Sequence, residues 1–152
     1  LDNTLRYTCR AGRQRHESPI RRGFRYLMVT LRGARGPVRL HDLHVVESTY
    51  PVAEVGRFRC SDSRLNDAWD ISRRTTRLCM EDTFVDCPSY EQVFWTGDAR
   101  NQALFASYAF GAEPLVRRCL RLVADSQAQS PLLNSHVPSG WTNVIPGFSL
   151  LW

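Results

Sequence analysis

The spacing of apolar residues divides the chain into two parts. Over residues 1–55, apolar residues occur in short runs rich in β-branched and aromatic side chains, as at 26–31 and 38–40. Gly and Pro separate these two runs at residues 33–37. Short apolar runs interrupted by Gly and Pro are typical of strands joined by turns. The first part therefore predicts β-structure.

After Pro51 the apolar spacing becomes helical. Four positions repeat at i, i+4, i+7 and i+11, namely Leu65, Trp69, Ser72 and Thr76. This spacing places the four side chains on one helix face, and Ser61 or Asp62 can provide the N-cap. The pattern predicts a helix over residues 62–80.

Two further helices are expected downstream. One spans residues 97–110, because Gly111 is a typical residue just past a helix end. Pro114 suits the first turn of the other, which has apolar residues on one face and arginines on the opposite face. Strands followed by helices indicate two domains rather than alternating β-α-β units. We therefore expect one domain over 1–55 and a second over 56–152.

Composition excludes several functions. The net charge is +5, with all 20 basic residues arginine, but no helix-turn-helix, zinc-finger or RNA-binding motif accompanies it, and we expect no nucleic-acid partner. The five cysteines contain no CxxC pair, so we expect buried thiols rather than disulfides or zinc ligands. His41 and His44 would lie on opposite faces of a strand, which disfavours a metal site. No apolar run is long enough to cross a membrane, and no membrane partner is expected.

Residues 86–98 carry the candidate chemistry, in the segment Asp-Cys-Pro-Ser-Tyr-Glu-Gln-Val-Phe-Trp-Thr-Gly-Asp. Glycoside hydrolysis needs a carboxylic acid that protonates the leaving oxygen, together with carboxylates and flat apolar faces that hold the sugar. Three carboxylates and large aromatic side chains here could provide these functions. The alternative is an ordinary acidic loop in which Asp98 caps the following helix and Trp95 fills the core.

The segment resembles the bacterial α-L-rhamnosidases of glycoside hydrolase family 78, in which Asp-Cys-Pro, a Glu and Trp-Thr-Gly-Asp carry the general acid and much of the sugar pocket. The resemblance continues through residues 99–104 and upstream at 23–26 and 58–62. One departure is that the family's commoner pattern places the acid six residues after the first Asp, whereas Glu91 lies five after Asp86. Counting back from Trp95 restores the usual spacing of four residues, which assigns the acid to Glu91.

The resemblance implies a fold and a mechanism. The fold would be mixed: the C-terminal part of a β-sandwich domain, followed by the first helices of an (α/α)6 toroid. The reaction would release terminal α-L-rhamnose with inversion, with Glu91 as the catalytic general acid and with Asp86, Trp95 and Asp98 binding substrate. The general base would be a Glu beyond residue 152. No metal or cofactor is expected.

From the ends of the sequence we expect a fragment of a longer protein. The chain begins without Met and ends in an apolar run at residues 144–152, which a natural terminus rarely exposes. The expected partners are a carbohydrate substrate of the rhamnoside class and the remaining domains of the parent chain. The isolated fragment is expected to be inactive, and its localisation, cytoplasmic or secreted, is not predicted.

Two alternatives remain open. A related (α/α)6 glycosidase could act on another sugar, since a fold persists while its substrate changes. A non-catalytic carbohydrate-binding or structural protein could use Glu91 to contact sugar without protonating it. Three later aromatic residues are expected in the core or at the rim rather than in contact with sugar: Trp141, Phe148 and Trp152.

Overall fold

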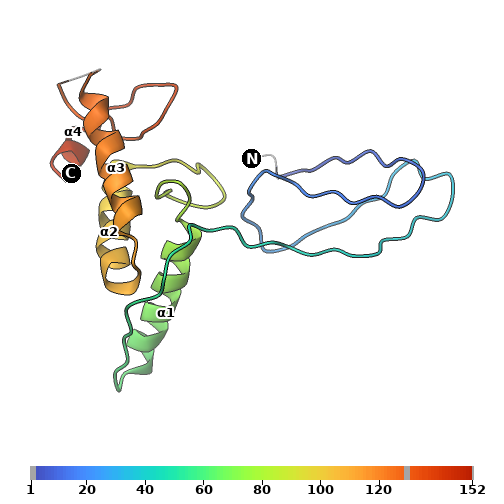
Figure 1. Cartoon of the computed structure of the whole chain (residues 1–152), viewed down its shortest axis with the longest axis horizontal. Helices are drawn as coiled ribbons and strands as arrows, with labels where there is room; N and C mark the ends of the chain where they lie inside the picture. Colours follow the sequence, from blue (N-terminus) through green and yellow to red (C-terminus); the bar gives the residue numbers. More distant parts are fainter. Residues whose placement is uncertain (1–2, 129–130, 152) are drawn as a thin grey trace. The chain divides into compact units, whose positions relative to one another are not determined.

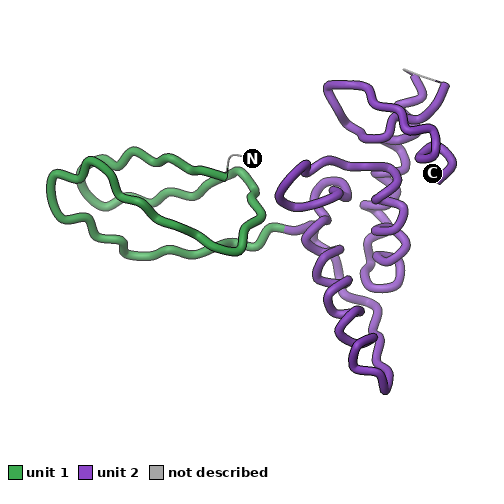
Figure 2. Tube along the Cα trace, turned by 180° about the vertical axis from the view of Figure 1, so that it is seen from behind, with its two compact units in different colours: residues 1–48 green, residues 49–152 purple. Residues whose placement is uncertain are grey.

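A computed structural model describes residues 3–128 and 131–151. The chain divides into two compact units, Leu1–Ser48 and Thr49–Trp152 (Figure 2). The second unit contains α1 (Ser63–Leu78), α2 (Thr96–Ala109), α3 (Glu113–Asp125), the 3-10 helix η1 (Ser126–Ala128) and the short α4 (Pro146–Ser149) (Figure 1). Everything that bears on the candidate site lies in this second unit.

The first unit corrects the predicted fold class, because residues 3–48 contain no strand and no helix. The predicted β-sandwich portion is therefore wrong. Residues of the apolar run 26–31 are largely open to solvent, with Tyr26 81% and Met28 87% exposed. A strand needs a hydrogen-bonded neighbour and an apolar layer to cover its face. Within the described residues, the run 26–31 has neither a paired strand nor an apolar layer over it.

The predicted first helix is confirmed by α1, which begins after Asp62 and ends before Cys79. The Asp62 side chain accepts a hydrogen bond from the backbone N–H of Arg64 at 2.9 Å, which satisfies one of the unpaired donors of the first turn. Trp69 lies between Phe58 and Phe105, with ring centroids 5.8 Å and 5.2 Å away. These rings join α1 to α2.

The two later helices are also confirmed. The α2 helix ends at Ala109, directly before the C-cap Phe110, and α3 has Pro114 in its first turn, as predicted. On α3 the buried residues repeat at intervals of four, and they face the core shared with α2. The buried residues of that core include Leu115, Cys119 and Val123 of α3, together with Met80, Phe84, Phe94, Ala106, Ala109, Phe110, Leu133 and Val137.

An extended segment before α1 lies along the C-terminal end of α2. The backbone N–H groups of Val55 and Gly56 both donate to the carbonyl of Ala109, at 3.0 Å and 3.2 Å. A Cβ added at Gly56 would lie 1.6 Å from the carbonyl oxygen of Tyr108. Glu54 accepts hydrogen bonds from Arg73 and Arg77 of α1. The segment therefore attaches the end of α2 to α1, and only glycine fits at its closest approach.

The expectation of buried thiols is right for only part of the cysteines. Cys79 and Cys119 are buried, Cys87 is half-buried, and Cys9 and Cys60 are exposed. Burial raises the pKa of the Cys119 thiol to about 11, so this thiol stays protonated at neutral pH. Within the described residues, no helix has the length and apolar character needed to span a bilayer.

Candidate active site

The candidate acid lies on a loop that closes on itself. The backbone N–H of Asp86 donates to the carbonyl of Val93 at 2.9 Å, and the N–H of Val93 donates to Asp86 Oδ1 at 3.0 Å. The thiol of Cys87 lies 3.0 Å from Asp86 Oδ2. Asp86 therefore holds the base of the loop, a structural role that the sequence alone did not indicate. A carboxylate has further lone pairs, so these contacts leave Asp86 able to accept a sugar hydroxyl.

The acid lies at the end of a turn over residues 88–91, and the residue after it has an unusual backbone conformation. Gln92 has φ of 53°, in the left-handed region that few residues other than glycine adopt. Its side-chain amide donates to the carbonyl of Pro88 at 2.8 Å, a contact that holds the turn. Backbone strain of this kind is often found at functional sites. The turn over residues 88–91 therefore ends at Glu91, and the Gln92 side chain bonds back to its first residue.

The strongest polar contact in the site joins these two residues. The indole N–H of Trp95 donates to Glu91 Oε2 at 2.6 Å. Glu91 itself is exposed, and Oε1 has no hydrogen bond to Trp95. The structure thus brings together the predicted acid and one of the predicted sugar-binding residues, through a hydrogen bond to one carboxyl oxygen.

Aromatic side chains surround the indole. The rings of His136 and Phe148 meet Trp95 edge-on, with centroid distances of 4.8 Å and 6.2 Å, and Trp141 lies 4.0 Å from His136. The Phe148 ring fills the space where a Cβ of Gly97 would stand, 2.6 Å away. Trp141 is 60% exposed, and Trp152 lies outside the described residues. Their predicted place in the core or at the rim, away from sugar, stays a prediction.

The third acidic residue of the site, after Asp86 and Glu91, is Asp98, which lies in the first turn of α2. It lies at the surface, but its surroundings withdraw part of the carboxyl from solvent and thereby raise its pKa, and the negative charges of Asp86 and then Glu91 raise that pKa further. The mutual electrostatic effect shows that the three acidic residues share one region. Asp98 does not cap α2. The N-cap residue is Trp95, whose side chain makes no capping hydrogen bond to the helix.

The raised pKa of Asp98 predicts a pH-dependent gain in stability for Asp98→Asn. A carboxyl whose folded pKa exceeds its unfolded pKa destabilises the fold as pH rises through that interval, and the full cost is present above the folded pKa. The variant should therefore unfold at a slightly higher temperature than the wild type at pH 7. The difference should shrink as pH is lowered toward the ordinary carboxyl pKa. Thermal unfolding from pH 4 to 7.5 measures this, and a pH-independent difference would contradict it.

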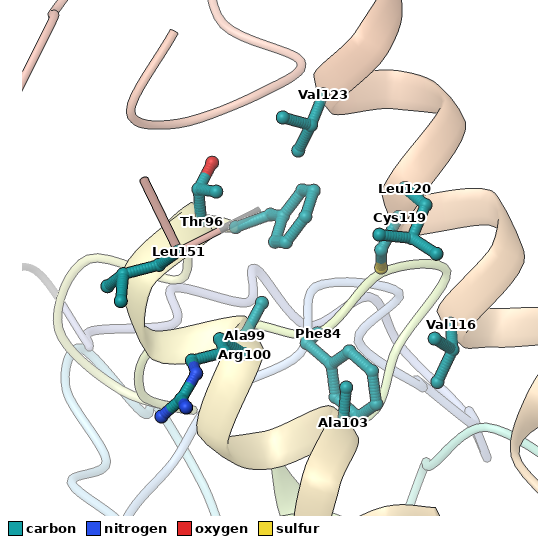
Figure 3. Close-up of a pocket in the computed structure, with 11 residues that line it drawn as sticks. Phe84, Thr96, Ala99, Arg100, Ala103, Val116, Cys119, Leu120, Val123 and Leu151 are labelled. Atoms are coloured by element: carbon teal, nitrogen blue, oxygen red, sulfur yellow. The ribbon is translucent and has the colours of Figure 1, made fainter. Parts of the chain in front are cut away.

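A separate cavity of about 160 Å³ lies between α2 and α3. Figure 3 shows the α3 side chains Val116, Cys119, Leu120 and Val123 facing Ala99 and Ala103 of α2. Among the described residues that line this cavity there is no carboxylate, and Arg100 is the only charged one. A sugar needs several hydrogen-bond acceptors that point at it, and this apolar cavity does not provide them. The candidate chemistry therefore lies at Asp86, Glu91 and Asp98.

His136 is the residue that sequence reasoning missed. It is 1% exposed, and its backbone pairs with that of Trp95 in an isolated antiparallel bridge. The sequence shows only an isolated histidine, with no motif that connects it to the acidic loop. In the part of the chain that the structure describes, no group of three or more His, Cys, Asp and Glu residues could hold a metal ion.

Comparisons with known proteins identify the family of this chain. Residues 53–152 match the family model of the bacterial α-L-rhamnosidase six-hairpin glycosidase domain. A solved structure, the crystal structure of the GH78 family rhamnosidase of Bacillus sp. GL1, is 62% identical with a TM-score of 0.66. The match covers 68% of this chain and 11% of that chain, so the present chain corresponds to about a tenth of the neighbour's length. A search of curated proteins found no match.

Proposed function

The chain belongs to the bacterial α-L-rhamnosidase family, with residues 53–152 in its six-hairpin glycosidase domain, and we propose that the full-length protein is an inverting glycosidase that releases terminal α-L-rhamnose. Glu91 is the general acid in this proposal, and Asp86, Trp95 and Asp98 bind the sugar. The matching family and the similar solved structure are both rhamnosidases, and this supports the substrate class.

The observation that carries the proposal is the hydrogen bond from the Trp95 indole to Glu91 Oε2. A general acid must present one protonated oxygen to the leaving group. Because Oε2 accepts from the indole N–H, a proton on the carboxyl resides on Oε1, the oxygen that faces away from this bond. The contact thus selects which oxygen delivers the proton and orients it.

The other carboxylates suit sugar hydroxyls. Asp98 lies at the surface beside Glu91, and Asp86 keeps free lone pairs beyond its loop contacts. A charge-assisted hydrogen bond contributes about 1.5–3 kcal/mol. The half-buried Trp95 ring can pack against the apolar C6 methyl of a deoxy sugar such as rhamnose. Together these groups bind the polar and apolar faces of one sugar ring.

Inversion requires a second carboxylate that activates water on the opposite face of the sugar, at roughly 6.5–9.5 Å from the acid. We propose that a residue outside these 152 provides it, since the described carboxylates around Glu91 have been assigned to the sugar. The remaining part of the full-length protein therefore completes the site.

The test is release of L-rhamnose by the full-length protein from an α-L-rhamnosyl disaccharide, followed by proton NMR. An inverting enzyme releases the β-anomer first, which mutarotates afterwards. Matched disaccharides carrying α-L-fucose or α-L-arabinose control for sugar specificity. Cleavage of another sugar alone would shift the substrate class, and binding of rhamnosides without cleavage of any glycoside would indicate a carbohydrate-binding protein.

A further inference from the structure

His136 lies between two tryptophans at the rear of the site. Its ring centroid is 4.8 Å from that of Trp95, at an interplanar angle of 75°, and 4.0 Å from that of Trp141. The backbone fixes this arrangement from both sides, since Thr96 N–H donates to the Ser135 carbonyl at 2.8 Å and Val137 N–H donates to the Phe94 carbonyl at 3.2 Å. The imidazole therefore has a fixed place against the indole.

His136 contacts its neighbours by packing of its ring rather than by hydrogen bonds of its ring nitrogens. Neither ring nitrogen has a hydrogen-bond partner among the described residues, although the residue is only 1% exposed. Burial lowers the pKa of the imidazole, against a weaker opposing effect of the Glu91 charge, which favours the neutral ring. A ring without hydrogen bonds to the described residues acts on Trp95 through packing.

Trp95 in turn contacts the acid. Its indole N–H reaches Glu91 Oε2 only while the ring keeps its present orientation. Phe148 borders the indole at a centroid distance of 6.2 Å, which is looser than the contact with His136. The imidazole is thus the nearer of the two aromatic contacts that limit rotation of the indole.

We propose that His136 is a positioning residue that holds the Trp95 indole so that its N–H fixes one carboxyl oxygen of Glu91. This inference rests on the proposed glycosidase function. A misplaced general acid lowers the rate most where the leaving group needs protonation, because displacement of reacting groups by about 1 Å can cost about 10²-fold in rate. A leaving group that departs as an anion depends little on the acid.

The experiment compares two substrates in the full-length protein. One is an unactivated α-L-rhamnosyl disaccharide, and the other is a dinitrophenyl α-L-rhamnoside, whose leaving group needs no proton. His136→Ala should lower kcat for the disaccharide at least about tenfold more than for the aryl substrate. His136→Phe, which retains a flat ring, should restore most of that difference, whereas His136→Asn, which retains polarity without a ring of that size, should not.

A double variant separates positioning from a general structural role. Trp95→Phe removes the indole N–H, so adding His136→Ala to it should not increase the difference between the two substrates any further. Equal losses on both substrates, or additive effects in the double variant, would overturn the inference. Failure of His136→Phe to restore the difference would also count against it.

Outcomes for the wild type distinguish this inference from the proposed function. If the wild type cleaves a different glycoside, the same comparison is made on that sugar, and only the rhamnoside assignment fails. If it cleaves no glycoside, both fail together. A crystal structure of full-length His136→Ala gives a readout without activity: the distance from Trp95 Nε1 to Glu91 Oε2 should exceed hydrogen-bonding range, and an unchanged distance would refute the positioning role.

Discussion

Replacing Glu91 with Gln is expected to lower kcat for an unactivated rhamnoside by at least about 10²-fold, the smallest usual contribution of general acid catalysis. Gln has nearly the size of Glu, and its carbonyl can still accept the Trp95 indole N–H, so the loop geometry should survive. Only the transferable proton is lost. The measurement is the steady-state rate of L-rhamnose release by the full-length variant.

Substrate choice and a matched variant make this result specific. The loss should be much smaller for a dinitrophenyl rhamnoside, because that leaving group needs no proton. Glu113→Gln is the control, since Glu113 is an exposed acid at the start of α3 whose contact is with Arg117. It should retain wild-type rates on both substrates. If Glu91→Gln cleaved the disaccharide as fast as the wild type, Glu91 could not be the acid.

Replacing Gly56 with Ala is expected to have the largest effect on stability. The added methyl would meet the Tyr108 carbonyl oxygen at 1.6 Å and the Ala109 Cα at 3.1 Å, and backbone atoms cannot rotate away as a side chain can. The segment must move, which also weakens the two hydrogen bonds to the Ala109 carbonyl. Overpacking combined with lost hydrogen bonds should cost roughly 3 kcal/mol or more.

Gly111→Ala is the matched control for this prediction. Gly111 belongs to the same contact, since its N–H donates to the Ala53 carbonyl, yet a Cβ there would meet only Val55 Cγ1 at an ordinary 3.8 Å. Calorimetry of the full-length protein should show a thermal transition several degrees lower for Gly56→Ala and almost unchanged for Gly111→Ala. Similar unfolding midpoints for both variants would contradict the prediction, because the segment around Gly56 would then shift without loss of stability.

The helices could be predicted because their signals are local. Asp62 caps α1 through the neighbouring Arg64, and Pro114 together with Gly111 marks the boundary between α2 and α3. The expected strands of residues 1–55 failed for the opposite reason. Strands form only where another segment pairs with them, and short apolar runs separated by Gly and Pro do not reveal whether such a segment is present.

The candidate site divides in the same way. The four predicted residues fall within one short segment whose composition suits sugar chemistry, and the structure places Glu91 and Trp95 in direct contact. The loop-closing role of Asp86 required the coordinates, because its carboxylate bonds to the backbone of Val93 rather than to a side chain. His136 lies against Trp95 because a long-range backbone bridge joins the two residues, and no sequence motif indicates that bridge.

The closed loop between Asp86 and Val93 has a consequence for protein engineering. Its two ends are bound to each other by backbone and carboxylate hydrogen bonds, so the loop backbone does not rely on the side chain of the exposed Tyr90. Position 90 is therefore suited to saturation mutagenesis in a search for variants that accept bulkier aglycones. A library at this position changes the surface beside the acid while the scaffold that carries the acid stays constant.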